Sequence, residues 1–193
     1  MLKTRIIPLL LIKDGLLKKP LRFTERERTV SSAISQARVF ESRQVDELIL
    51  LDIGKSSTTD QKFVRSINSV IVKQIAEELT VPLTVGGGVR NIETFGQLVS
   101  AGAEKITINS GAIDRPKFIT EAAKIFGTQC VVVSIDIKRH EDNSLEVYSR
   151  NGRVPTGLTP SDWARTAVGL GAGELLVNTI DSDGTMEGFD IGA

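Results

Sequence analysis

The chain has 193 residues, 40% of them hydrophobic and 25% charged, which is typical of one globular domain with a sizeable core. Lys and Arg number 24, as do Asp and Glu, so no net charge points to nucleic acid or a membrane surface as partner. The single cysteine, Cys130, cannot form an internal disulfide, and the apolar run 6–12 is too short to span a membrane. We therefore expect a cytoplasmic protein that recognises its partners at local sites.

Short runs rich in Val, Ile and Leu recur along the chain, and each is followed by a glycine or polar turn. Segments with the spacing of amphipathic helices separate these runs, and this alternation predicts parallel βα units. The predicted strands are 5–12, 47–53, 82–86, 105–109, 130–137 and 174–180. The predicted helices are 30–37, 67–79, 92–100, 116–126 and 160–170.

Two segments do not fit this alternation: a basic loop at 13–27, and residues 139–157, where Asn151 and Gly152 predict the turn of a small hairpin. Both follow strand ends, where parallel barrels build their sites, so we interpret them as functional. A complete eight-unit barrel needs roughly 200 to 250 residues. We expect a single α/β barrel domain over 1–193 without its last two βα units, whose first and sixth strands need a covering partner.

Three glycines, Gly86, Gly87 and Gly88, lie at the end of a predicted strand and directly after it. Glycines let backbone amides turn toward an anion without obstruction by a Cβ atom. Asn109 and Ser110 follow the next strand, and neighbouring strand ends lie side by side in a barrel. We predict that Gly88, Asn109 and Ser110 bind one phosphate of a small-molecule substrate, with a tight turn that holds no ligand as the alternative.

Four aspartates each close an apolar strand, an arrangement that suits general acid or base chemistry at one mouth of a barrel. They are Asp52, Asp136, Asp181 and Asp183. For Asp183, which precedes a glycine, a role in forming the turn is an equal alternative. The only histidine, His140, lies in a charged loop, which argues against a His-dependent triad or a multi-His metal site. We expect neither a metal nor a cofactor.

Longer stretches are more specific, among them RIIPLLLIKDG, PLTVGGGVRNIETFGQLVSAGAEKITINS and GAGELLVNTIDSDGTMEGFD. Together they resemble the cyclase subunit of imidazole glycerol phosphate synthase, a lyase family of histidine biosynthesis, over residues 1–191. The resemblance implies a (β/α)8 TIM barrel of the phosphate-binding type. It also implies a glutaminase partner at the N-terminal face, which delivers ammonia through the barrel core to a ribonucleotide at the opposite face.

The resemblance also implies roles for single residues. Gly88, Asn109 and Ser110 match the family's site for one substrate phosphate. Asp136 matches one of its two catalytic aspartates. Further residues are expected at the substrate or on the mobile loop, where the family has a lysine; they are Lys19, Asp52, Asn178 and Asp183.

The family's ammonia path opens through a ring of two basic and two acidic residues. The matching residues are Arg5, Glu47, Lys105 and Glu174. Each begins a predicted strand, as a charged ring at the floor of a barrel requires. Salt bridging at the surface is the alternative, but a ring of two plus two charges also avoids an unpaired buried charge.

Two departures from the family pattern bear on function. Leu11 stands where the family has its other catalytic aspartate, and leucine can neither accept nor donate a proton. Asn178 stands where the family usually has threonine. Our leading hypothesis is an ammonia-channelling synthase subunit of a glutamine amidotransferase, from a divergent branch that serves amidation of a sugar in surface polysaccharide biosynthesis. This hypothesis implies two partners, a glutaminase subunit and a sugar amidotransferase.

Three alternatives remain open. The first is the cyclase of histidine biosynthesis, which converts the phosphoribulosyl formimino ribonucleotide and ammonia to imidazole glycerol phosphate and AICAR. The second is a scaffold for the glutaminase without chemistry of its own. The third is the sister ribonucleotide isomerase, which works without a glutaminase.

Overall fold

A computed structural model of the chain describes residues 4–24, 27–54 and 67–193. These residues form an α/β fold with a mostly parallel sheet, as predicted, and the fold is compatible with a (β/α)8 barrel. The chain divides into two compact units. Unit 1 comprises Met1–Lys18 and Thr29–Ile106, and unit 2 comprises Lys19–Arg28 and Thr107–Ala193. Within the described ranges, no helix is both long and apolar enough to cross a membrane.

In unit 1, parallel strands form the centre of the sheet. The strands that lie wholly or partly in this unit are β1 (Leu9–Lys13), β2 (Leu16–Pro20), β3 (Glu27–Ser32), β4 (Leu48–Asp52), β5 (Leu83–Gly86) and the start of β6 (Lys105–Ile108). β4 pairs in parallel with β1 on one side and with β5 on the other. Leu48, Leu50 and Val85 are completely buried, as expected for parallel strands covered on both faces.

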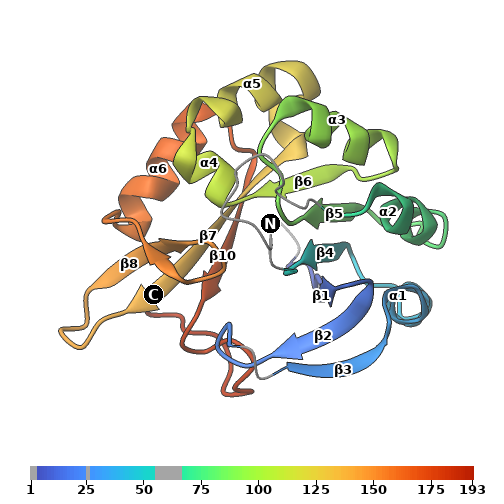
Figure 1. Cartoon of the computed structure of the whole chain (residues 1–193), viewed down its shortest axis with the longest axis horizontal. Coiled ribbons are helices and arrows are strands. Elements are labelled where there is room, and N and C mark those ends of the chain that lie inside the picture. The colour runs from blue at the N-terminus through green and yellow to red at the C-terminus, as the bar shows by residue number, and fades with distance from the viewer. Residues whose placement is uncertain (1–3, 25–26, 55–66) are drawn as a thin grey trace. The chain divides into compact units, whose positions relative to one another are not determined.

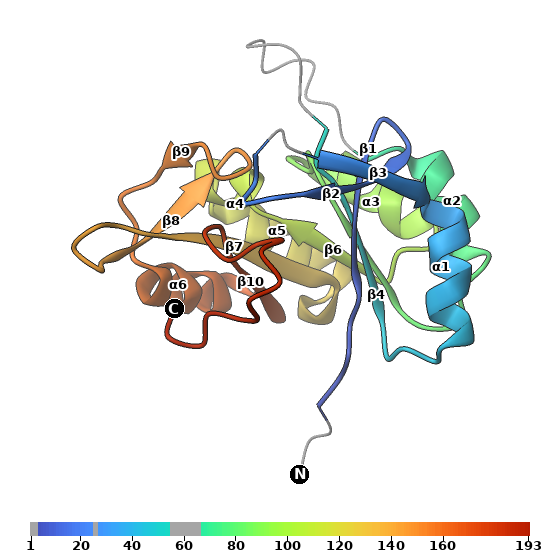
Figure 2. The ribbon, with the colours of Figure 1, turned by 90° about the horizontal axis from the view of Figure 1, so that it is seen from below.

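Three helices cover one face of these strands (Figure 1). They are α1 (Ala33–Ser42), α2 (Ser69–Ala76) and α3 (Ile92–Ser100). The asparagine before each of the last two helices caps it: Asn68 accepts from the backbone amide of Val70, and Asn91 from that of Thr94. α1 and α2 lie side by side (Figure 2), and Arg38 of α1 forms two hydrogen bonds with Glu78, just after α2.

Unit 2 has β7 (Val131–Arg139) and β10 (Glu174–Thr179) as its parallel pair, in a register that places Asn178 opposite Asp136. β8 (Leu145–Ser149) and β9 (Val154–Pro155) continue from β7 as antiparallel strands. The helices of this unit are α4 (Ser110–Asp114), α5 (Lys117–Phe126) and α6 (Pro160–Leu170). For α6 the sequence sets both ends: Thr159 caps the first turn, with proline following, and Gly171 ends the helix in the left-handed conformation.

The predicted loop at 13–27 is partly wrong, because its described part contains β2. Asp14 and Gly15 form a tight turn with positive φ, and β2 runs back antiparallel to β1. Residues 25–26 of that loop lie outside the described residues. The helix predicted from residue 30 begins at Ala33, because residues 27–32 extend as β3. Cys130, predicted to begin a strand, instead ends a short 3-10 turn, Thr128–Cys130.

Candidate functional site

The candidate catalytic residue, Asp136, lies near the carboxyl end of β7 and is only 6% exposed. Three side chains donate hydrogen bonds to its carboxylate. The Nδ2 atom of Asn109 lies 2.8 Å from Oδ2, and the Nδ2 atom of Asn178 lies 2.9 Å from Oδ1. The hydroxyl of Ser134 lies 3.4 Å from the same Oδ1 atom. The sheet supplies this arrangement, since Ser134 precedes Asp136 by two residues on one face and Asn178 is its partner on β10.

Compared with an exposed aspartate, the environment of Asp136 favours the neutral form of its carboxyl group. Burial raises the pKa of Asp136 to about 6, against the opposing effect of hydrogen bonds from Asn178, Ser134 and Asn109. The negative charge of Asp183 raises this pKa further. A carboxyl group with a pKa near neutrality can both take up and release a proton under cellular conditions, as general acid–base catalysis requires.

Two buried oxygens of this cluster have no hydrogen-bond partner among the described residues: Oδ1 of Asn109 and Oδ2 of Asp183. Burial also raises the pKa of Asp183. A buried acceptor without a donor is costly, by about 1–3 kcal/mol. Both oxygens are therefore suited to accept hydrogen bonds from a ligand. The structure thus brings together four of the predicted residues, Asn109, Asp136, Asn178 and Asp183.

A second buried carboxylate, Glu47, lies just before β4 in unit 1 and is 1% exposed. Its Oε2 atom accepts hydrogen bonds from Arg5 Nη1 at 3.0 Å and from Lys105 Nζ at 2.7 Å. Its Oε1 atom accepts one from the hydroxyl of Thr84 at 2.5 Å. Three of the four residues predicted for the charged ring therefore form one cluster. The fourth, Glu174, begins β10 in unit 2.

The backbone turn after β5 explains part of the glycine motif. Gly87 has a φ of +114°, and a Cβ atom there would lie 2.4 Å from the backbone oxygen of Asp52. Gly88 also has a positive φ, of 70°. Asp52, the strand-end aspartate nearby, accepts a hydrogen bond from the amide of Gly54 through Oδ1. The turn itself thus requires Gly87, whereas anion binding at Gly88 stays a prediction.

Ser110, predicted to bind phosphate with Asn109, is contacted by the hairpin of unit 2. Its hydroxyl accepts a hydrogen bond from the backbone amide of Arg150 at 2.9 Å. Arg150, Asn151 and Gly152 all have positive φ values, and they form the predicted hairpin turn. With its oxygen engaged in this way, the hydroxyl of Ser110 keeps its proton for another acceptor.

Two further predicted residues lie on neighbouring strands. Lys19 lies on β2 with its side chain exposed. An exposed side chain of this kind can contact a ligand that binds at the surface. Leu11 is partly buried in the middle of β1, where it pairs with Leu51 of β4 and Lys18 of β2. No proton-transfer group therefore occupies this position on β1.

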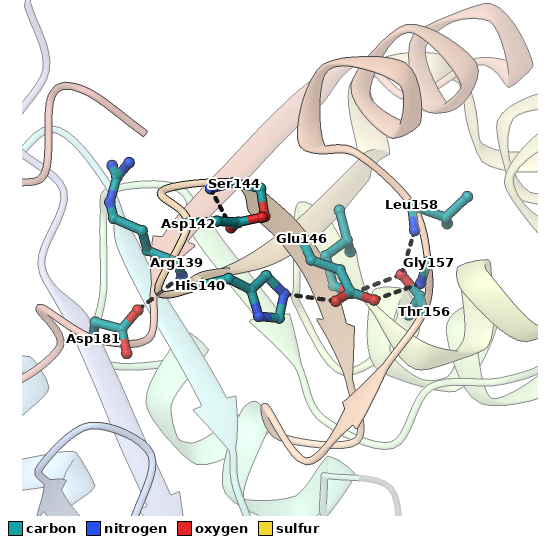
Figure 3. Close-up of polar contacts among 10 residues, drawn as sticks. Arg139, His140, Asp142, Ser144, Glu146, Thr156, Gly157, Leu158 and Asp181 are labelled. Atoms are coloured by element: carbon teal, nitrogen blue, oxygen red, sulfur yellow. Dashed lines mark hydrogen bonds and ion pairs between the residues drawn. The ribbon is translucent and has the colours of Figure 1, made fainter.

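The hairpin segment, residues 139–157, also contains the single histidine (Figure 3). His140 Nε2 lies 2.8 Å from Oε2 of Glu146, whose other oxygen accepts a hydrogen bond from the amide of Gly157 at 2.7 Å. Asp181, one of the strand-end aspartates, is exposed and accepts a hydrogen bond from the backbone amide of Arg139. The contacts of Glu146 stabilise the hairpin segment, and the hydrogen bond of Asp181 connects the segment after β10 to the end of β7.

Sequence reasoning missed two hydroxyl residues of these clusters, Thr84 and Ser134. Both are polar residues within apolar strands and are buried, at 1% and 4% exposure. Ser134 was recognisable from its spacing, because residues two apart on a strand share a face. Thr84 and Glu47 are 37 residues apart, and nothing in the local sequence pairs them.

A family model and a known relative each match almost the whole chain. Residues 5–193 match the family described as histidine biosynthesis protein. The chain is also 41% identical, over 191 residues, to imidazole glycerol phosphate synthase subunit HisF of Alkaliphilus metalliredigens (strain QYMF). That alignment covers 99% of this chain and 73% of the relative.

Proposed function

Because the chain belongs to the histidine biosynthesis protein family, we propose that it is a cyclase-type synthase subunit of the imidazole glycerol phosphate synthase kind. In this proposal it uses ammonia from a glutaminase partner and acts on a phosphorylated small molecule. The observation that carries the proposal is Asp136, a buried carboxylate with a pKa of about 6 at the end of a parallel strand. The cytoplasmic location stays a prediction.

Asp136 supplies the proton transfer in this proposal. When ammonia attacks a carbon of the substrate, the new nitrogen substituent carries an extra proton, which the ionised carboxylate accepts. The protonated carboxyl group then donates a proton to the group that leaves. Because the pKa of Asp136 is about 6, both forms are accessible near neutral pH.

Substrate binding and ammonia entry are assigned to the two units separately. In unit 2, we propose that Ser110 and Asn109, which donates a hydrogen bond to Asp136, contact a substrate phosphate. In unit 1, we propose that Arg5, Glu47 and Lys105 control the entry of ammonia. Gly88 and Glu174 remain predicted members of these two sets.

Leu11 favours a second candidate, in which ammonia is passed to a different acceptor. Ring closure in the family uses a pair of aspartates, and this chain retains only Asp136. Amidation of a sugar by a further protein in surface polysaccharide biosynthesis would not need the second acid. In that case the chain would conduct ammonia and would have a sugar amidotransferase as an additional partner.

The experiment measures release of AICAR from the phosphoribulosyl formimino ribonucleotide, with ammonium salt as the nitrogen source. The proposal expects turnover by the unmodified protein, and a loss of about 10²- to 10⁴-fold in Asp136→Asn. A matched control is Asp181→Asn, which changes an exposed strand-end aspartate and should retain activity. Turnover that is equal in both variants would contradict the role of Asp136.

A second arm of the experiment separates the two candidates. With purified glutaminase and glutamine, the cyclase candidate expects AICAR and glutamate in equal amounts. If glutamate forms without AICAR, and if Leu11→Asp then produces AICAR, the sugar-amidation candidate is favoured.

A further inference from the structure

Asn178 has an unusual position among the groups around Asp136. It is the direct partner of Asp136 in the parallel register between β10 and β7. Its Nδ2 atom lies 2.9 Å from Asp136 Oδ1 and 3.3 Å from the hydroxyl oxygen of Ser134. One nitrogen thus contacts two oxygens of the cluster, and both of its partners belong to β7.

An amide can serve both partners because its nitrogen carries two hydrogens, whereas a hydroxyl group has only one. Ser134 also donates to Oδ1 of Asp136, so this oxygen receives two hydrogen bonds. Oδ2 receives one, from Asn109. Since each carboxylate oxygen has about two lone-pair sites, Oδ2 retains one that is unused.

We propose that Asn178 is a positioning residue, which together with Ser134 occupies Oδ1 of Asp136 and leaves Oδ2 as the oxygen that exchanges a proton with the substrate. The inference deepens the proposed function and rests on it for the identity of the substrate. The hydrogen-bond geometry on which it depends belongs to unit 2 alone.

Electrostatics support this role. Among the three donors, Asn178 is the strongest influence that holds the pKa of Asp136 down against burial. Asp183, on the segment after β10, is the ionisable group whose charge acts on Asp136 in the opposite direction. Burial and the charge of Asp183 both raise the pKa of Asp136, and the hydrogen bond from Asn178 lowers it. Removing the amide of Asn178 should therefore raise this pKa.

The test is an NMR titration of the protein labelled with 13C at the aspartate carboxyl carbon, in which Asp136→Asn identifies the signal of Asp136. The unmodified protein should titrate near pH 6. Asn178→Leu, of similar size, should move the midpoint upward by about one pH unit, as expected for the loss of one hydrogen bond to a charged group. Asn178→Ala is the second variant, for use if the leucine variant does not fold.

Asn178→Thr should move the midpoint back toward the unmodified value, because its hydroxyl restores one donor. Thr179→Val is the matched control: it removes a polar group from the adjacent position of β10, whose side chain points to the other face, and should leave the midpoint unchanged. An unchanged midpoint in a folded leucine or alanine variant overturns the proposal. Because the titration needs no substrate, this outcome is distinguishable from a failure of the proposed function, which would appear only as absent turnover.

Discussion

Glu47 and Asp136 are both buried carboxylates at strand ends, yet their surroundings differ in kind. Glu47 shares one oxygen between two cations, Arg5 and Lys105, and receives a hydroxyl hydrogen bond on the other. Asp136 is contacted by two amides and one hydroxyl. Full positive charges compensate the first carboxylate, whereas only dipoles compensate the second.

This difference separates a cluster of paired charges from a group that can do proton chemistry. The carboxylate of Glu47 is bound to two cations and forms the centre of a charge cluster. Dipolar donors offset only part of the cost of burial, which leaves the pKa of Asp136 at about 6. The same type of side chain can therefore have two roles, and the partners determine which.

The largest expected effect comes from removing the carboxylate of the first cluster. Glu47→Leu should lower the free energy of unfolding by about 4 kcal/mol, because the largely buried Lys105 loses its ion pair with Glu47. Urea unfolding followed by the fluorescence of Trp163 measures the change. The matched control is Glu78→Leu, which breaks the more exposed pair with Arg38 and should cost far less.

A double substitution sharpens this prediction. Combining Glu47→Leu with Lys105→Met removes both the carboxylate and the buried cation, so most of the lost stability should return. Arg5 is partly exposed, so water can replace its contact with Glu47. A double variant as unstable as Glu47→Leu alone would show that packing, not the lost ion pair, explains the loss.

The second effect concerns Asp136 and depends on pH. Its pKa is raised from 3.8 to about 6 in the folded chain, so between these values the folded state binds a proton that the unfolded state does not. Stability from this group therefore falls as pH rises from about 4 to 6, by about 3 kcal/mol in total. Unfolding free energies measured across this range should show the fall in the unmodified protein.

Asp136→Asn should lack this component, so the difference in stability between the variant and the unmodified protein should change with pH. Contributions from groups distant from Asp136 are common to both proteins, and the comparison removes them. A difference that stays constant from pH 4 to pH 7 would contradict the raised pKa of Asp136.

Much of the fold followed from the sequence because parallel strands buried on both faces give continuous apolar runs. All six predicted strands and all five predicted helices correspond to elements of the structure, and helices 92–100 and 160–170 have the predicted ends, whereas the ends of most other elements are shifted. β2 and β3 were missed because strands such as Leu16–Pro20 carry lysine and proline and lack the apolar run of a buried strand. Their pairing depends on the turn at Asp14 and Gly15, a tertiary choice that composition does not reveal.

The sites were predictable to different degrees. The position of Asp136 after an apolar run already indicated a strand-end carboxylate, but its pKa depends on burial and on Asn109 and Asn178, which lie 27 and 42 residues away. The cluster of Arg5, Glu47 and Lys105 came from family resemblance. Contacts across such separations depend on the register of the sheet, and a single sequence does not show that register directly.

The smallest expected effect lies in the hairpin of unit 2, where a carboxylate is less buried than either of the two compared above (Figure 3). Glu146 is 20% exposed, and the pKa of this carboxyl is lowered, first by the amide of Gly157 and then by His140. Its charged form therefore stabilises the hairpin above its ordinary pKa of 4.5, and this contribution is lost as pH falls through the lowered value.

Glu146→Gln should weaken the hairpin by about 1 kcal/mol at pH 7, because a neutral amide oxygen accepts the Gly157 hydrogen bond less strongly and the contact with His140 is weakened. Hydrogen exchange of the Gly157 amide should then be about five-fold faster, with little change in the global free energy of unfolding. Asp142→Asn is the matched control, since Asp142 accepts its hydrogen bonds from Ser144 and not from Gly157, and the variant should leave the Gly157 amide protected. Equal acceleration in both variants would mean that the hairpin responds to any lost carboxylate, and that Glu146 has no specific part in holding residue 157.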